Sequence, residues 1–337
     1  MRYLVTTLIL CLFVSLPVPR VFSQSPAPED EATSGKIKTG DAYLSWAALT
    51  FELSAGYRTD KLNWHIAGNA QGSDPNVRSE LTWSDIKIYQ LKLANRTVIK
   101  DRVYVRGHLD FGTVVSGSNR DSDFNGENRT QEFSRSLNGV DGNDVWDGSV
   151  GIGPRFSVFE STMIICPMLG YALSEQDLNI VDGFQTIAAP PATMPIGPIL
   201  GLDSRYQTSW EGPWLGVDLL FSIPGTNTPF TKVGVMFTGE YHWVDYSAEA
   251  NWNLREDYGH PVSFSHEAEG SGYVVGATIL FEIKNRWGIH AGMNVKELTT
   301  DAGLDRTYYA DGTTDDTRLN EVSWRSFTFE AGVSCQF

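Results

Sequence analysis

The chain has few cysteines and too little positive charge to balance its acids. It carries three cysteines in 337 residues and 26 Lys and Arg against 41 Asp and Glu, so its formal charge is −15. This shortage of positive charge argues against a large nucleic-acid interface, which needs clustered Lys and Arg. After residue 23 the chain also lacks an apolar run long enough for a transmembrane helix, which excludes an ordinary α-helical membrane protein. With 41% hydrophobic residues, it is nevertheless too apolar to be disordered.

Signatures of common cofactor and metal sites are also missing. The sequence has no His-x-His or Cys-x-x-Cys pattern that would indicate zinc. The stretch Gly151-Ile152-Gly153-Pro154 begins like a nucleotide-binding loop, but no helix can follow it. Cys166 and Cys335 lie in predicted strands, and we place both on a lipid-facing side, so we expect two inert thiols rather than a disulfide.

The beginning of the chain predicts export. Residues 1–23 combine a short positive end with an uncharged apolar run and a small-residue exit, which is typical of a secretory signal peptide cleaved before Gln24. Residues 24–41 are rich in Pro, Ser, Gly and charge, which predicts a flexible periplasmic lead-in. The folded domain is therefore expected over residues 42–337.

The remaining chain alternates with a period of two. The clearest case is its last strand, where apolar side chains share one face and polar ones share the other; the apolar face holds Phe327, Phe329, Ala331, Val333, Cys335 and Phe337. A soluble secreted β-sandwich would give the same alternation. A terminal aromatic residue on such a strand, however, resembles the assembly signal of bacterial outer-membrane proteins. We therefore expect Phe337 to be recognised by the barrel assembly machinery.

The faces opposite the apolar ones carry charge. Apolar side chains on one face and charged ones on the other, over segments of about ten residues, are what a membrane barrel with a wet interior requires. The polar side chains on the inner face include Arg106, His108, Asp110, Glu240, His242 and His290, which we expect to form lumen-filling ion pairs. The tryptophans near strand ends are expected to anchor the interface with lipid: Trp46, Trp83, Trp146, Trp214, Trp243 and Trp287.

Connection lengths alternate as well. Short connections alternate with long polar ones: the short ones lie at 95–101, 159–162, 223–230 and 284–286, and the long ones lie near 58–80, 113–144, 173–207, 245–271 and 297–320. The Pro-rich run 183–202 is predicted to be a loop. This asymmetry predicts an all-β fold, a transmembrane antiparallel up-and-down β-barrel of about ten strands. It would lie in the bacterial outer membrane, in contact with its lipid, with the long loops facing outside.

The order of landmarks resembles the omptins, ten-stranded outer-membrane endopeptidases. Ser79-Glu80-Leu81-Thr82-Trp83 is similar to their Ser-x-Leu-x-Trp, and Asp121-Ser122-Asp123-Phe124 is similar to the Asp-x-Asp-aromatic piece of their active-site cleft. The resemblance implies catalytic roles for Asp121 and Asp123. It also implies an Asp-x-His half-site on the opposite wall, yet an ungapped count puts Ala250 and Trp252 there. Neither can replace the imidazole base that activates water.

The region from Ser118 to Arg135 also resembles the Protochlamydia-type outer-membrane protein family, a resemblance that implies a porin-like or surface-exposed role. The same region has the spacing of a twelve-residue calcium loop, with Asp121, Asp123, Asn125 and Glu132 as oxygen ligands and Gly126 at the turn. Calcium is therefore the possible cofactor, and the alternative is a solvated acidic loop whose residues favour turns.

Three functions remain open. The first, which we favour, is a barrel with a porin-like or surface-exposed structural or binding role on an omptin-like scaffold that lacks the Asp-x-His half-site. The second is an omptin-like endopeptidase with a rearranged catalytic site. The third is the soluble secreted sandwich.

Overall fold

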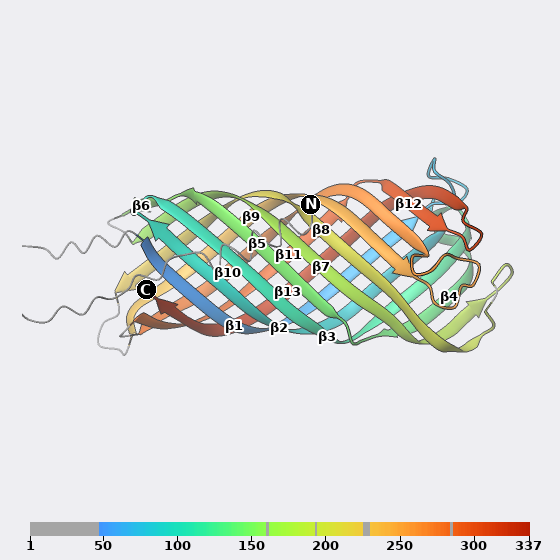
Figure 1. Ribbon diagram of the computed structural model, residues 1–337, viewed down its shortest axis with the longest axis horizontal. Helices are drawn as coiled ribbons and strands as arrows, with labels where there is room; N and C mark the ends of the chain where they lie inside the picture. The colour runs from blue at the N-terminus through green and yellow to red at the C-terminus, as the bar shows by residue number, and fades with distance from the viewer. Residues whose placement is uncertain (1–46, 160–161, 193, 225–229, 284–285) are drawn as a thin grey trace, which may run out of the picture.

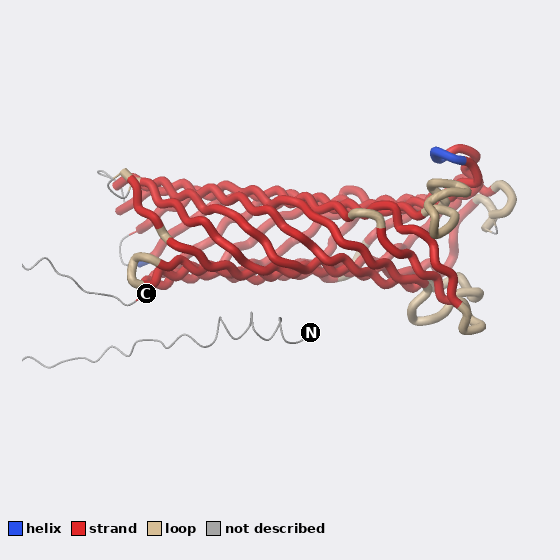
Figure 2. The backbone as a smooth tube through the Cα atoms, turned by 90° about the horizontal axis from the view of Figure 1, so that it is seen from above, coloured by secondary structure: helices blue, strands red, loops and turns tan. Residues whose placement is uncertain are grey.

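The computed structural model describes residues 47–159, 162–192, 194–224, 230–283 and 286–337. The predicted signal peptide, the lead-in and Trp46 lie outside the described residues. The described chain forms an elongated barrel of long, tilted strands (Figures 1 and 2). Among the described residues, no helix is both long and apolar enough to cross a membrane.

Within the described residues, thirteen strands form one antiparallel sheet. They are β1 (Ala47–Ile66), β2 (Ser79–Ile99), β3 (Val103–Gly126), β4 (Thr130–Val140), β5 (Asp144–Pro154), β6 (Phe156–Val158), β7 (Met163–Ala188), β8 (Gly197–Pro224), β9 (Phe230–Asn251), β10 (Phe264–Ile283), β11 (Trp287–Thr300), β12 (Gly303–Tyr308) and β13 (Thr314–Gln336). A short 3-10 turn, η1 (Glu127–Arg129), joins β3 to β4.

These strands occupy ten positions around the barrel. β4 and β5 both lie between β3 and β7, and β11 and β12 both lie between β10 and β13, so each set fills one position. The last strand pairs with the first, from Thr50 opposite Gln336 to Ile66 opposite Leu319. The predicted antiparallel barrel of about ten strands is confirmed.

A belt of exposed apolar side chains surrounds the half of the barrel that contains the chain's C-terminus. It includes Tyr89, Leu91, Leu169, Leu215, Trp243, Tyr273, Trp287, Phe329 and Phe337. On β13 the belt includes Phe327, Phe329 and Val333, which alternate with inward-facing residues, as expected for a strand that crosses a bilayer. We call the end of the barrel next to the belt the turn end and the other the loop end. Trp243 and Trp287 lie in this belt, as predicted.

Beyond the belt, the strands continue for about the same length again. β1 reaches Ile66, β7 reaches Ala188 and β8 begins at Gly197, so most residues predicted to lie in long loops belong to strands. The prediction of a loop over residues 183–202 is wrong at 183–188 and at 197–202, which belong to β7 and β8. The reason is that a strand wall outside the bilayer has water on its outer face, so it can carry polar residues on both faces and loses the clear alternation.

Ion pairs cross the interior of the barrel beneath the loop end. Asp147 on β5 accepts hydrogen bonds from Arg58 on β1, at 2.5 Å, and from Lys296 on β11, at 2.7 Å. Arg58 also pairs with Asp60, which accepts a hydrogen bond from Gln176 on β7. β5 and β11 are five strand positions apart in either direction, so the Lys296–Asp147 pair spans the full width of the lumen.

Of the predicted ion pairs nearer the turn end, the one between Arg106 and Glu240 is confirmed. Arg106 pairs with Asp218 and Glu240, and Glu240 accepts a hydrogen bond from His242 at 2.7 Å. His108 lies 3.6 Å from Asp110. His290 is 2.7 Å from the hydroxyl of Ser54 on a neighbouring part of the wall.

An aromatic layer that the sequence did not predict fills the interior on the loop-end side of Arg58 and Lys296. Trp83 stacks on Tyr206 with ring centroids 5.0 Å apart, and Trp210 lies 5.9 Å from Trp324. Trp64 and Tyr206 approach to 6.1 Å although β1 and β8 are five positions apart. All of these rings are buried, and they form one cluster with Leu62, Leu81, Ile86, Ile88, Val114, Val140, Val145, Leu178, Ile180, Val244, Tyr246, Phe264, Leu298, Leu319 and Val322.

Three residues that we assigned to the lipid face point inward. Trp83 and Trp214 are 0% and 1% exposed, and Cys166 packs with Trp214, Tyr104 and other side chains inside the barrel at 3% exposure. The error in each case is one of register, because a shift of a single residue moves a side chain to the other face of a strand. Cys166 and Cys335 are both free, on opposite faces of the wall.

Candidate functional site: a pocket at the mouth of the barrel

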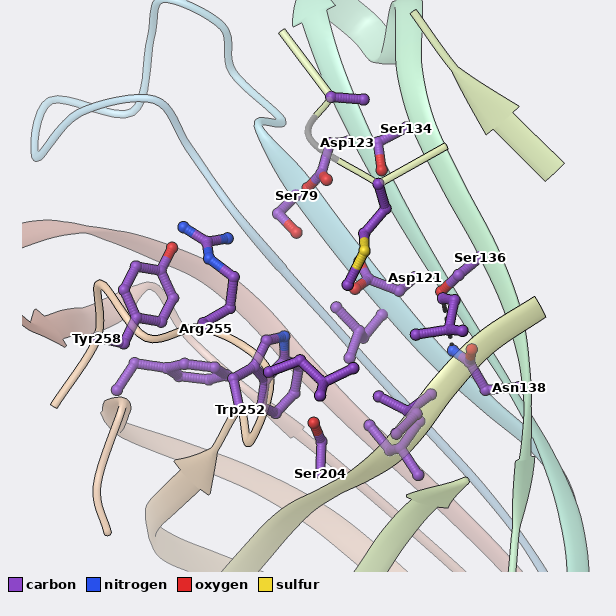
Figure 3. A pocket seen from close by; sticks show the side chains of 18 of the residues that line it. Ser79, Asp121, Asp123, Ser134, Ser136, Asn138, Ser204, Trp252, Arg255 and Tyr258 are labelled. Carbon is purple, nitrogen blue, oxygen red and sulfur yellow. Dashed lines mark hydrogen bonds between the residues drawn. The ribbon is translucent and has the colours of Figure 1, made fainter. Parts of the chain in front are cut away.

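A pocket of about 850 Å³ opens at the loop end, above the aromatic layer. One wall comes from β3, β4 and the end of β7, and the other comes from the connection between β9 and β10 together with the start of β10 and part of β12. Figure 3 shows the polar wall facing the connection that carries Trp252, Arg255 and Tyr258. The pocket thus lies where the long loops meet, on a floor of packed aromatic rings.

Asp121 and Asp123 line the polar wall, as the resemblance to omptins implied. They lie two apart on β3, so both side chains point to the same face. Burial raises the pKa of Asp121 well above its ordinary value, and the neighbouring Asp123 carboxylate raises it further. Burial also raises the pKa of Asp123, although hydrogen bonds from Ser79 and Ser134 oppose this. The pair therefore holds a proton more readily than two exposed carboxyl groups would.

Two buried amides continue the same wall below the carboxyl groups. Asn138 on β4 donates to the Asn119 side-chain oxygen on β3 at 2.8 Å and to the Ser136 hydroxyl at 3.0 Å. Asn119 Nδ2, Asn138 Oδ1 and Asp121 Oδ1 are buried atoms that have no hydrogen-bond partner within the described protein. Sequence reasoning missed both amides. Asn119 could have been found from the sequence, because it precedes Asp121 by two residues and therefore lies on the same face of the strand.

The opposite wall is partly apolar. The Trp252 ring packs edge-on against Phe264 at 4.8 Å, and Arg255 stacks over Tyr258 at 4.0 Å while it pairs with Asp257. Ala250 is buried at the end of β9 and does not line the pocket. Of the two positions that the ungapped count put in the missing half-site, Trp252 is therefore the one that faces the pocket (Figure 3).

Among the described residues that line the pocket, none is a histidine. His266 lies beneath it, fully buried, with one ring nitrogen 2.8 Å from the Tyr206 hydroxyl and the other 3.1 Å from Asp305. His260 is exposed and bonded to Asn251, and His242 lies deep in the barrel with Glu240. Neither ring nitrogen of His266 is available to activate water in the pocket, because both already have partners.

The four residues of the calcium spacing do not form a twelve-residue loop. β3 continues to Gly126 and pairs with β4, so Asp121 lies opposite Ser136 and Asp123 lies opposite Ser134 in a hairpin. Asn125 accepts a hydrogen bond from Arg78 at 2.7 Å, and Glu132 pairs with Arg135. In the part of the chain that the structure describes, no group of three or more His, Cys, Asp or Glu side chains could hold a metal ion. The geometry does not support the calcium-loop interpretation.

Comparisons with known proteins agree with the fold. A family model described as Protochlamydia outer membrane protein matches residues 52–337. The outer membrane protease OmpT from Escherichia coli aligns in structure with a TM-score of 0.68 at 14% identity, covering 86% of this chain and 97% of its own. The translocator domain of the autotransporter NalP from Neisseria meningitidis aligns with a TM-score of 0.35 at 10% identity, covering 85% and 88%. No curated protein matches the sequence.

Proposed function

The chain belongs to the Protochlamydia outer membrane protein family, and from this premise we propose that it is a plugged outer-membrane barrel that binds a ligand at its extracellular mouth and does not conduct solutes. Its location in the bacterial outer membrane fits both the family and the OmpT-like fold. The sequence left a porin-like role and a binding role open. The contents of the lumen favour binding.

The observation that carries this proposal is the pair of layers across the interior. The Lys296–Asp147 pair joins opposite walls at 2.7 Å, and both Lys296 and Arg58 lie against the ring of Trp324 in the aromatic layer above. A hydrated ion or a small solute would have to displace both layers at once. Ten strands leave an interior that side chains can fill, unlike the wide lumen of larger porins. The mouth pocket, by contrast, is open and combines aromatic rings with a few polar groups, as ligand sites commonly do.

Planar bilayers test the proposal. We expect the purified full chain, inserted from detergent, to give no discrete current steps. A triple variant, Arg58→Ala, Lys296→Ala and Trp324→Ala, removes side chains from both layers and should give current if it retains the heat-modifiable gel mobility of a folded barrel. Discrete steps from the unaltered protein would refute the plugged barrel.

Endopeptidase activity is the second candidate function, because one observation favours it. Asp121 and Asp123 line a solvent-open pocket in a chain that has the fold of an outer membrane protease. The pocket lining that the structure describes nevertheless supplies no imidazole to act as the base. We therefore rank this activity below ligand binding.

A further inference from the structure

We propose that the ligand of the mouth pocket is a neutral saccharide, with a sugar ring held between the Trp252 indole and the amide groups of Asn119 and Asn138. The inference rests on the proposed binding function and names the chemical class of its ligand. Three features of the pocket carry it: the unpartnered polar atoms of one wall, the aromatic surface of the other, and the excess of acidic side chains in the lining.

The polar wall offers hydrogen-bonding atoms of both kinds. Asn119 and Asn138 are 2% and 8% exposed, and Asn119 Nδ2 is an unpartnered donor beside two unpartnered acceptors, Asn138 Oδ1 and Asp121 Oδ1. Buried polar groups almost always have partners, and leaving one unsatisfied is costly. A cluster of three at the wall of an open pocket therefore points to a ligand that supplies the missing partners.

The mixture of donor and acceptor limits the chemistry of that ligand. An ammonium or guanidinium group only donates and would leave the Asn119 amide unpartnered, whereas a phosphate only accepts and would face Asn138 Oδ1 and Asp121 with like partial charge. A hydroxyl group both donates and accepts. Neighbouring hydroxyl groups of one sugar ring can therefore satisfy all three atoms, and Ser136 and Ser204 add further hydroxyl partners along the same surface.

The facing wall suits the other side of such a ring. Trp252 is partly exposed and is held in place by a T-shaped contact with Phe264, with ring centroids 4.8 Å apart, so it presents a fixed apolar surface to the pocket. A sugar ring is polar at its rim and apolar on its C–H face, so it matches an aromatic surface opposite polar side chains. Figure 3 shows Trp252 and Asn138 on opposite sides of the space, with Ser204 below them.

The charges in the pocket argue against an anionic ligand. Arg255 faces the Asp121–Asp123 pair closely enough to stabilise both carboxylates, and Arg78 does the same for Asp123. The acids of the described lining outnumber these two guanidinium groups, so the pocket opposes an anion; they are Asp121, Asp123, Glu256, Asp257 and Asp305. A neutral ligand does not meet this opposition.

Calorimetric titration of the full chain in lauryldimethylamine oxide, a detergent without a sugar headgroup, tests the inference. The saccharide probes are maltotriose, cellotriose and N,N′-diacetylchitobiose, and the peptide probes are tetra-alanine amide and Ala-Arg-Arg-Ala. We expect saturable binding of at least one saccharide, weakened at least tenfold by Asn138→Leu and by Trp252→Ala. Trp252 lies in a loop, so its variant remains informative if Asn138→Leu fails to fold.

Matched controls lie outside the pocket. Trp243→Ala removes an outward-facing ring of the lipid belt, and Asn63→Leu removes an amide that bonds to Thr82, so both should bind as the unaltered protein does. The inference is overturned if no saccharide binds, or if Asn138→Leu and Trp252→Ala bind as well as the controls. If a peptide binds instead and both variants lose that binding, the mouth pocket is a binding site but its ligand is not a saccharide. If none of the probes binds, the binding role is refuted as well. The conductance experiment then still tests whether the lumen is plugged.

Discussion

Lys296 and Asp147 come from opposite walls of the barrel, and their charged atoms meet at 2.7 Å inside it. Asp147 also accepts a hydrogen bond from Arg58, so one carboxylate neutralises two cations that reach it from different strands. Both cations then lie against the Trp324 ring. The ionic layer and the aromatic layer are therefore one connected structure, and we expect it to stabilise the barrel.

Removing the central carboxylate should destabilise the barrel strongly. Asp147→Ala leaves Lys296 without its carboxylate and Arg58 with only Asp60, and breaking a buried ion pair from one side costs about 3–5 kcal/mol. The urea midpoint, read by gel mobility of the folded and unfolded forms, measures the loss. Asp316→Ala breaks an exposed pair with Arg306 and should leave the midpoint unchanged. Equal midpoints for the two variants would show that the ionic layer is not structural.

Asp121→Asn should stabilise the protein at neutral pH and have a smaller effect in acid. The pKa of Asp121 is raised in the folded state by burial and by Asp123, so folding favours its protonated form. Its ionisation costs nothing below the unfolded pKa, near 3.9, and costs progressively more as the pH rises through the folded pKa. Thermal midpoints of the variant and the unaltered protein, compared at pH 4 and pH 8, measure this. A larger gain at pH 4 than at pH 8 would contradict the assignment.

The purified protein should not hydrolyse peptides. The described lining of the mouth pocket has two carboxyl groups but no imidazole, and His266 beneath it is buried with both nitrogens bonded. Fluorogenic peptides with a dibasic site, incubated with the protein reconstituted in outer-membrane lipid, provide the assay. Turnover that disappears in both Asp121→Asn and Asp123→Asn would establish the second candidate function instead.

Calcium should change neither the stability of the protein nor the protection of its β3–β4 hairpin. Asn125 already bonds to Arg78, and Glu132 pairs with Arg135, so two of the four oxygen ligands are engaged by cationic side chains. Thermal midpoints and limited proteolysis of the hairpin, each with calcium and with a chelator, measure the response. A stabilisation by calcium that is lost in Asp123→Ala would restore the calcium-loop interpretation.

The sequence by itself determined the wall of this protein. A strand that is apolar on one face and charged on the other over about ten residues is suited to the wall of a membrane barrel. The apolar belt, the antiparallel order and the number of strand positions could therefore be predicted from local patterns in the sequence. The pair Asp121 and Asp123 could also be assigned to one face, because they are two residues apart on one strand.

The tertiary structure alone decided what fills the barrel and what faces the two carboxyl groups. Contacts such as Lys296 with Asp147, or Trp64 with Tyr206, join strands five positions apart, and no local pattern encodes which side chains meet across a lumen. Register decided the rest: a shift of one residue places Trp83 and Cys166 inside instead of in lipid. Beyond the bilayer the outer face of each strand meets water, so the alternation of polar and apolar residues no longer shows which side chains point inward. Only the tertiary structure shows that Asn119, Asn138 and Trp252 line one pocket.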